Sequence, residues 1–198
     1  DDTWRDLERA MRQATQGSEF GYEHCGWPLD FHSGAVAITV TFPAGFEQFD
    51  LSVKNDDVIE SLAKEYKVNC YRGSEDDVLD RFYKAVKEIK PKLIVRLTSD
   101  CPLIDSQLID EIIIQAKTKG LDYYANIIEE RYPDGQDIEI FTFNALEKAW
   151  KEAKQVSDRE HVTPYIRNNS TSKGGNLFTS ENHNLEINYN HVRLTVDE

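Results

Sequence analysis

Residues 93–105 read LIVRLTSDCPLID, a short apolar run that ends at a carboxylate, a proline and a turn. The apolar, partly β-branched residues predict a strand that is buried on both faces. Pro102 prevents the strand from continuing, so Asp100 falls just beyond its carboxyl end. Ligands of open α/β sheets bind at that end, and a carboxylate there can hold Mg²⁺. The alternative is that Asp100 only caps a turn, where aspartate is common.

The composition is that of an ordinary globular protein. The chain has 198 residues, of which 39% are hydrophobic and 30% are charged, enough for one good-sized domain or one domain with a small appendage. No apolar run approaches the roughly 20 residues that span a bilayer, and the sequence shows no signal peptide. We therefore expect a cytoplasmic protein that does not bind membranes.

The net charge and the cysteines exclude further classes of function. A formal charge of −13 argues against binding to nucleic acid, which depends on Lys and Arg at the phosphates. Cysteines 25, 70 and 101 are odd in number and show no CxxC spacing, which favours free thiols in a reducing compartment. The five histidines show no spacing typical of a zinc site.

The sequence divides near residue 50. Residues 1–50 predict a helix over 3–16 and a small β-meander over 20–27, 35–42 and 46–53, without a chemical motif. Residues 51–198 alternate between helices and strands, which predicts an α/β domain with a mostly parallel sheet. The helices are expected over 55–67, 75–90, 106–119, 144–154 and 158–167, and strands over 68–71, 122–126 and 137–143. The predicted caps are Ser74, Ser106 and Asn144 at helix starts and Gly120 at a helix end.

From about residue 55 onward the chain resembles the SpsF-like spore-coat polysaccharide cytidylyltransferases, relatives of the enzymes that make CMP-activated acidic sugars. The matching segments occur in the family's order and cover about three quarters of the chain. They are DDVIESLAKEYKV, YRGSEDDVLDRF, VRLTSDCPLID, YPDGQDIEIF, REHVTPYI and RLTVDE. The resemblance implies a three-layer α/β fold of the glycosyltransferase-A type, with residues 1–50 as a small α+β addition.

The same resemblance implies an activity, a metal and two substrates. Members of the family transfer a cytidylyl group from CTP to a sugar precursor of bacterial surface polysaccharides and release pyrophosphate with Mg²⁺. Asp100 maps onto a catalytic, metal-binding aspartate, and Asp197 onto a second acidic metal-binding position. Two carboxylates from strand ends suit a cation that offsets charge on the α-phosphate. A homodimer is compatible with the resemblance.

On the nucleotide side, the resemblance assigns Arg72, Gly73, Ser74 and Arg81. Either arginine could pair with phosphate. The alternative for Arg81 is an exposed position on the helix surface.

On the acceptor side, the resemblance assigns Asp134, Asp137, Glu139, Arg159 and His161. The three acids could orient a sugar, or could simply occupy a turn and the solvated face of a strand. A lone histidine is more often a structural hydrogen-bonding group than an acid or base, so His161 receives no role in proton transfer.

Residues 1–50 depart from the family pattern. Family members begin with a strand that runs into a loop rich in Gly, Arg and Lys, which holds the triphosphate through backbone N–H groups and cationic side chains. Residues 1–50 contain three basic residues against nine acidic ones and no such loop. The alternative to an enzyme is therefore a noncatalytic fragment, fusion or chimera of this fold that acts as a binding or interaction module.

Overall fold

The computed structural model describes residues 37–41, 46–52, 57, 60–61, 64, 69–98, 100–101 and 103–195. Only the backbone is described for residues 37–41 and 46–52. The predicted helix over 3–16, the predicted strand over 20–27 and the predicted metal ligand Asp197 lie outside the described residues, as does most of the predicted helix over 55–67.

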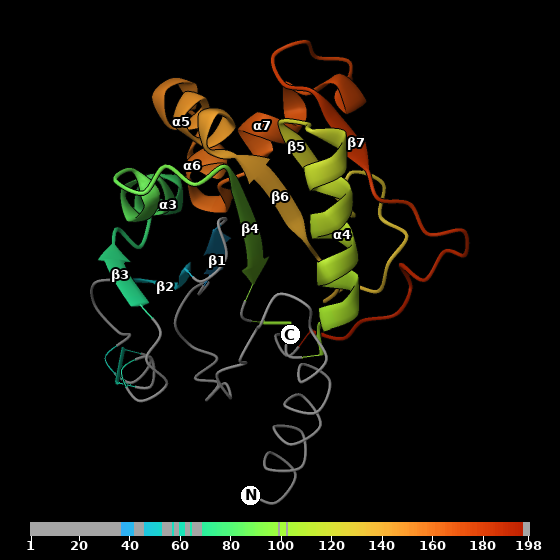
Figure 1. The fold of residues 1–198 in the computed structure, drawn as a ribbon, viewed down its shortest axis with the longest axis horizontal. Helices are drawn as coiled ribbons and strands as arrows, with labels where there is room; N and C mark the ends of the chain where they lie inside the picture. Colours follow the sequence, from blue (N-terminus) through green and yellow to red (C-terminus); the bar gives the residue numbers. More distant parts are fainter. Residues whose placement is uncertain are drawn as a thin grey trace, which may run out of the picture.

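The described residues form one seven-stranded sheet in the order β3-β2-β1-β4-β6-β5-β7 (Figure 1). Its strands are β1 (Ala37–Thr41), β2 (Phe46–Ser52), β3 (Asn69–Gly73), β4 (Leu93–Thr98), β5 (Tyr123–Ala125), β6 (Glu139–Thr142) and β7 (Ser180–Asn182). The apolar run that predicted a central strand is β4, which lies between β1 and β6. Two strands from the predicted N-terminal addition thus join this sheet; the domain boundary near residue 50 stays a prediction.

The sheet is mixed, so the expectation of a mostly parallel sheet was wrong. Strand β1 is antiparallel to β2 and β4, and β6 is antiparallel to β4 and β5. Among the seven described strands, the parallel pairs are β2 with β3 and β5 with β7. Helical crossovers do set β3, β4 and β5 in one direction, as the alternating pattern predicted. However, β1 and β6 are inserted between strands that share a direction, and this removes most of the parallel pairings.

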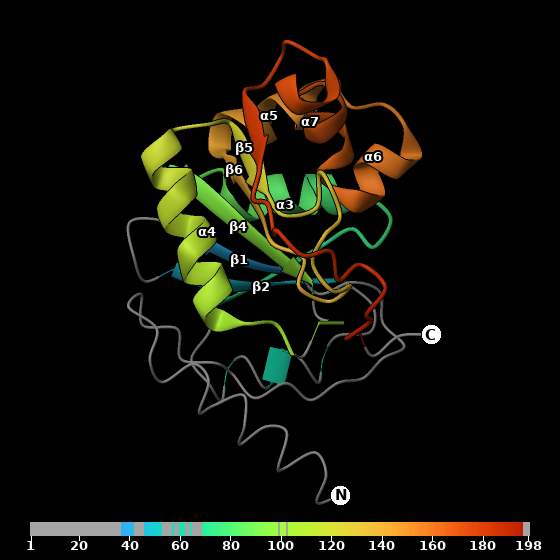
Figure 2. The ribbon, with the colours of Figure 1, turned by 90° about the vertical axis from the view of Figure 1, so that its right-hand side faces the viewer.

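Helices cover both faces of the sheet. The α-helices are α3 (Val78–Val86), α4 (Ser106–Lys119), α5 (Phe143–Glu152), α6 (Val156–His161) and α7 (Pro164–Asn168), followed by the short 3₁₀ helix η1 (Thr171–Lys173). Helix α4 packs on one face, while α3 and α5–α7 pack on the other (Figure 2). The molecule therefore has the expected three-layer α/β architecture.

The alternation of side chains along β4 explains the two cores. Ile94 points to the core shared with α3 and α5, whereas Val95 points to the core beneath α4. Both side chains are 0% exposed, as expected of a strand covered on both faces. Because Arg96 lies on the same face as Ile94, β4 carries a cation into the larger core.

The caps of three helices differ from the prediction. Asp105, rather than Ser106, caps α4 by accepting a hydrogen bond from the Gln107 backbone N–H. Asp77, rather than Ser74, caps α3 by accepting a hydrogen bond from the Asp80 backbone N–H. Thr142, one residue before α5, caps that helix in place of Asn144. Ser, Thr, Asp and Asn side chains can all cap a helix, so residue type alone does not show which of several neighbouring residues is the cap.

The predicted helix over residues 158–167 is broken at Val162. Its φ of 70° is rare for a β-branched residue, and the Thr163 N–H donates to the His161 carbonyl across it at 2.8 Å. This is a γ-turn of the strained type. Pro164 then starts α7 at a position that tolerates proline. The turn separates α6 from α7 and buries Val162 completely.

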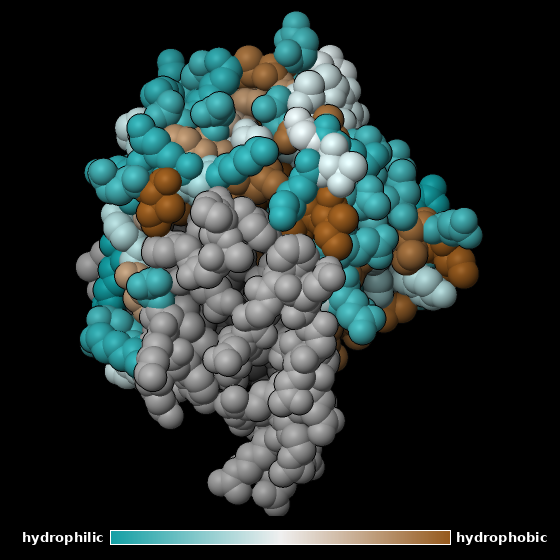
Figure 3. Space-filling view, in the orientation of Figure 1, coloured by the Kyte–Doolittle hydropathy of each residue, from teal (hydrophilic) through white to brown (hydrophobic). Residues whose placement is uncertain are grey.

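One face of the molecule is drawn in Figure 3 with its hydropathy. Figure 3 shows polar side chains over most of the described part of this face, with separate hydrophobic patches. Among the described residues, no helix combines the length and the apolar character that crossing a membrane requires.

Candidate functional site

Asp100 follows the carboxyl end of β4, where the sequence predicted it, and its side chain is half-buried. Cys101 beside it is buried, and its thiol lies 3.1 Å from the Thr98 hydroxyl and 3.6 Å from Asp100 Oδ1. Burial, together with the nearby carboxylates of Asp100 and Asp137, raises the pKa of Cys101 to about 12. The sulfur is therefore a neutral thiol at pH 7 and a poor nucleophile.

A polar pocket lies next to this strand end. It has a volume of about 320 Å³. Its lining residues come from the loop between β5 and β6 and from the C-terminal segment: Asn126, Ile127, Glu130, Tyr132, Asp134, Asp137 and Asn190. The two acceptor-side aspartates predicted from the sequence thus line one pocket.

Asp137 is the most perturbed carboxyl group of the pocket. Burial, reinforced by the charges of Glu139, Asp134, Asp100 and Glu130, raises its pKa to about 6. The influence of Asp100 means that the end of β4 and the start of β6 lie close together. Since a base is most useful when its pKa lies near the working pH, Asp137 is suited to accept a proton.

Two buried amides build the loop that carries Asp137. The Asn126 side chain is 1% exposed; it donates to the Gln136 carbonyl at 2.6 Å and accepts from the Ile138 N–H at 2.9 Å. The Gln136 side chain accepts from the Asp105 N–H at 2.9 Å and donates to the Leu103 carbonyl at 2.8 Å. The loop before β6 is thereby bonded both to the end of β5 and to the loop after Asp100.

An aromatic cluster supports the other wall of the pocket. The ring of Tyr132 stacks on His183, with centroids 6.0 Å apart. The Tyr124 hydroxyl lies 2.9 Å from His183 Nδ1. Burial lowers the pKa of His183, although the Glu111 carboxylate opposes this. At neutral pH the imidazole of His183 is therefore uncharged, and its stacking holds the ring of Tyr132 in place.

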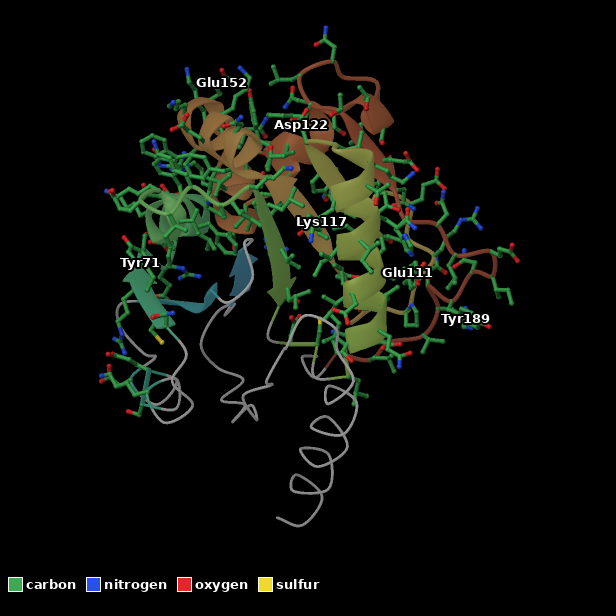
Figure 4. All side chains as sticks on the ribbon, in the orientation of Figure 1. Tyr71, Glu111, Lys117, Asp122, Glu152 and Tyr189 are labelled. Carbon is green, nitrogen blue, oxygen red and sulfur yellow. The ribbon has the colours of Figure 1, made fainter. Side chains whose placement is uncertain are left out.

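The C-terminal segment closes against the Asp134–Gly135 turn. Asp134 exchanges backbone hydrogen bonds with Val192 and Leu194 at 2.9 and 2.7 Å, and Arg193 Nε lies 3.3 Å from Asp134 Oδ2. Farther out, Tyr189, labelled in Figure 4, donates its backbone N–H to the Arg131 carbonyl at 2.7 Å. These contacts bring residues 189–194 to the pocket and explain why Asn190 lines it.

Glu139 is placed differently from the two aspartates. It lies on β6, is 1% exposed and does not line the pocket. Its carboxylate forms an ion pair with the Arg96 guanidinium at 2.5 Å and accepts a hydrogen bond from the Tyr123 hydroxyl at 2.6 Å. Glu139 thus belongs to a buried network below Asp137, and its predicted contact with a sugar stays a prediction.

The structure brings the four predicted nucleotide-side residues together between β3 and α3. Arg72 pairs with Asp57 at 2.7 Å and with Glu60 at 3.0 Å. Arg81 is 1% exposed, so it is not the exposed helix residue that the alternative supposed. It donates to the Ser74 carbonyl at 3.0 Å and lies so close to Gly73 that a Cβ there would be 2.7 Å from Arg81 Cγ. Arg81 therefore shapes the loop.

Arg159 and His161 lie on α6, and neither lines the pocket. The Arg159 guanidinium pairs with both oxygens of Asp77, the shortest contact being 2.7 Å, and also donates to the Trp150 carbonyl at 2.9 Å. His161 is exposed. The contacts of Arg159 join α6 to the start of α3, and the predicted roles of both residues toward the acceptor stay predictions.

The carboxylate of Asp100 at the end of β4 fits Mg²⁺, a cation that prefers oxygen ligands. Magnesium is commonly held by one or two carboxylates together with substrate phosphates, and Asp100 offers a half-buried carboxylate without an ion-pair partner among the described residues. Within that same part of the chain, no group of three or more His, Cys, Asp or Glu side chains is arranged to hold a metal ion.

Sequence reasoning missed several residues of the site. Asn126, Tyr132 and Gln136 lie inside or beside the recognised YPDGQDIEIF segment, but their amide and aromatic groups gave no sign of chemistry by spacing alone. Glu130 could have been suspected from the acidic stretch that precedes that segment. Asn190 lies more than 50 residues after Asp137 in sequence, and only the folded chain brings it to the pocket.

The fold and the site define a class: a three-layer α/β protein whose carboxylates converge beside a pocket at the end of its central strand. The family model for cytidylyltransferases matches residues 52–195. The chain therefore belongs to the cytidylyltransferase family.

Individual relatives agree with this assignment. The chain is 48% identical over 118 residues to the uncharacterized protein MJ1063 of Methanocaldococcus jannaschii, covering 59% of this chain and 46% of that protein. It is 36% identical over 116 residues to the spore coat polysaccharide biosynthesis protein SpsF of Bacillus subtilis, covering 58% and 47%. The chain thus spans about half the length of each. A solved cytidylyltransferase structure from Leptospira borgpetersenii superposes with a TM-score of 0.67 at 35% identity, covering 75% of this chain and 61% of that one.

Proposed function

We propose that the protein transfers a cytidylyl group from CTP to a hydroxyl of a sugar precursor used in surface polysaccharide biosynthesis. The observation that carries the proposal is the pocket of Asp134 and Asp137 beside Asp100 at the end of β4. Membership of the cytidylyltransferase family supports the reaction class, and the similarity to the spore coat protein SpsF supports the pathway.

In the proposed reaction, the acceptor hydroxyl oxygen bonds to the α-phosphorus of CTP while the bond from that phosphorus to the β-phosphate bridging oxygen breaks. Pyrophosphate leaves with the electron pair of the broken bond. Asp137 accepts the hydroxyl proton, as its pKa of about 6 allows at neutral pH. Asp134 orients the acceptor by accepting hydrogen bonds from the hydroxyl groups of the sugar.

On the nucleotide side, we place CTP against the loop of Gly73 and Ser74, which Arg81 holds in shape through the Ser74 carbonyl. Asp100 and Asp197 would hold Mg²⁺. When bound, the ion would neutralise part of the charge on the phosphates. The charge of Asp100 contributes to the raised pKa of Asp137, and an ion bound at Asp100 would oppose that contribution.

Titration of CTP by calorimetry, with and without Mg²⁺, tests the proposal. We expect binding that depends on the metal and that Asp100→Asn weakens by at least tenfold, since carboxylate ligands supply most of the affinity of such sites. Glu88→Gln removes one charge from a side chain that is 86% exposed and serves as the matched control. Pyrophosphate release over a panel of sugars then identifies the acceptor.

A noncatalytic binding module is the second candidate. It is favoured by one observation, namely that the family match begins at residue 52, so the stretch that holds the triphosphate in relatives has no counterpart in the match. This candidate predicts no binding of CTP at millimolar concentration with Mg²⁺ present.

A further inference from the structure

The loop that carries Asp100 and the loop that carries Asp137 are joined by one side chain. Gln136 lies next to Asp137 in sequence and is 7% exposed. Its amide oxygen accepts from the Asp105 N–H at 2.9 Å, and its amide nitrogen donates to the Leu103 carbonyl at 2.8 Å. Both partners are backbone groups more than 30 residues away in sequence.

Each end of this connection is anchored to a rigid element. The Gln136 carbonyl accepts from the buried Asn126 side chain at the end of β5. Asp105 caps α4 by accepting from the Gln107 N–H at 2.8 Å. The Gln136 side chain therefore ties the end of β5 to the start of α4, with Asp100 and Asp137 on the two loops between them.

The ladder between β4 and β6, as far as its residues are described, does not extend to these two loops. Strand β4 pairs with β6 only from Leu93 with Thr142 to Arg96 with Glu139. Beyond the pair of Arg96 and Glu139 this ladder stops; Asp100 lies on the loop after β4, and Asp137 lies on the loop before β6. Their separation depends on what joins these loops, and a glutamine amide with both its donor and its acceptor engaged holds them in one geometry.

We propose that Gln136 is a positioning residue that sets the distance between the metal side and the acceptor side of the site. The proposal rests on the function proposed above. Gln136 does not touch the reacting atoms; it acts through the two loops. Because an error of about 1 Å in alignment can cost about a hundredfold in rate, loss of this amide affects the transfer step more than the binding of CTP.

Amide hydrogen exchange followed by NMR gives a test that needs no substrate. In the unmodified chain we expect the Asp105 N–H to be protected, although it lies in a loop. In Gln136→Met, which keeps the length of the side chain but loses both hydrogen bonds, we expect the amides of Asp105 and Gln107 to exchange at least tenfold faster. Trp150→Phe is the control, because it loses a hydrogen bond to Asp80 in another part of the fold and leaves these amides protected.

Kinetics then separates positioning from simple stability. With the acceptor found in the sugar panel, Gln136→Met lowers kcat for pyrophosphate release about tenfold to a hundredfold, while its Kd for CTP with Mg²⁺ stays that of the unmodified chain. Trp150→Phe lowers Tm without changing kcat per folded molecule. An unprotected Asp105 amide in the unmodified chain, or a Gln136→Met variant with unchanged kcat, overturns the proposal. If the unmodified chain binds no CTP, the proposed function fails, and hydrogen exchange alone decides whether Gln136 holds the loops.

Discussion

Arg96 and Glu139 face each other directly across β4 and β6 and form an ion pair of 2.5 Å inside the larger core. The side chain of Glu139 is 1% exposed and that of Arg96 is 15% exposed. The Tyr123 hydroxyl donates to the other oxygen of Glu139 at 2.6 Å. Burial, reinforced by the charge of Glu139, raises the pKa of Tyr123 well above its ordinary value, so the phenol stays protonated and able to donate.

Loss of one partner of this pair is expected to be costly. Glu139→Gln leaves the largely buried Arg96 cation without the counter-charge of Glu139, and we expect the free energy of unfolding in urea to fall by about 3 kcal/mol. The double variant Arg96→Met/Glu139→Gln should lose less than the sum of the two single variants, because it leaves no unpaired charge. Strictly additive losses would contradict an energetic coupling between the two residues.

The stability of the protein should depend on the ionisation of Asp137. Its pKa is raised from 3.8 to about 6, so between about pH 4 and pH 6 the folded protein keeps a proton that the unfolded chain has released. The free energy of unfolding therefore falls as pH rises through this window, by up to about 3 kcal/mol at 1.36 kcal/mol per pH unit. We expect Asp137→Asn to be more stable than the unmodified chain at pH above about 7 and similar to it near pH 4. Urea unfolding at several pH values measures this, with Glu88→Gln as the control; an Asn variant that is less stable at neutral pH would refute it.

The same group should control the rate of transfer. If Asp137 accepts the proton of the acceptor, kcat falls as pH drops below about 6, because the protonated carboxyl cannot act as a base. Asp137→Asn should slow transfer about 10²-fold or more and abolish this acidic limb. A pH–rate profile for pyrophosphate release decides the matter, and an acidic limb that persists in the Asn variant would assign it to another group.

Arg159 offers a test that separates a structural role from a role in binding. Its guanidinium donates hydrogen bonds to both carboxylate oxygens of Asp77, the residue that caps α3. Because lysine cannot reproduce a two-pronged contact, Arg159→Lys should lower the free energy of unfolding by about 1–2 kcal/mol. Thermal unfolding measures this loss. A raised KM for the acceptor in the same variant, with stability unchanged, would instead support the substrate contact predicted from the sequence.

Gly135 should tolerate no side chain. Its φ is 100°, and a Cβ would lie 2.9 Å from the Leu194 carbonyl carbon. Gly120 also has a positive φ, of 63°, but a Cβ there would meet nothing within 4 Å. We expect Gly120→Ala to cost about 1 kcal/mol, from backbone strain alone, and Gly135→Ala clearly more. Equal losses in thermal unfolding would mean that the C-terminal segment does not pack on this turn in solution.

The sequence predicted best those elements whose ends carry strong local signals. Helix α4 covers the predicted residues Ser106–Lys119 and ends before Gly120 as predicted, because an apolar stripe leads to a glycine with positive φ. Its cap is nevertheless Asp105 and not the predicted Ser106. The position of Asp100 just after β4 followed from the proline that interrupts the strand. By contrast, the break at Val162 depends on a strained turn within an otherwise helical pattern, which local propensity does not reveal.

Pairing within the sheet and the interior of the site were less accessible. Nothing in the local pattern of β6 shows that it is inserted between β4 and β5, because strand neighbours are chosen by long-range packing. The pairing of Glu139 with Arg96 has the same origin, since charged residues on a strand ordinarily face solvent. The side chains of Asn126 and Gln136 form hydrogen bonds with backbone groups that are distant in sequence, so the spacing of residue types does not predict their roles.

Most of the pocket lining comes from the loop between β5 and β6. The two strands that flank this loop form an antiparallel ladder from Tyr123 with Phe141 to Ala125 with Glu139. Such an arrangement is modular, because residues between fixed roots can be exchanged or lengthened at small entropic expense. Under the proposed function, related chains could therefore diversify in their acceptor by altering residues 127–135, while the strands beneath kept their register.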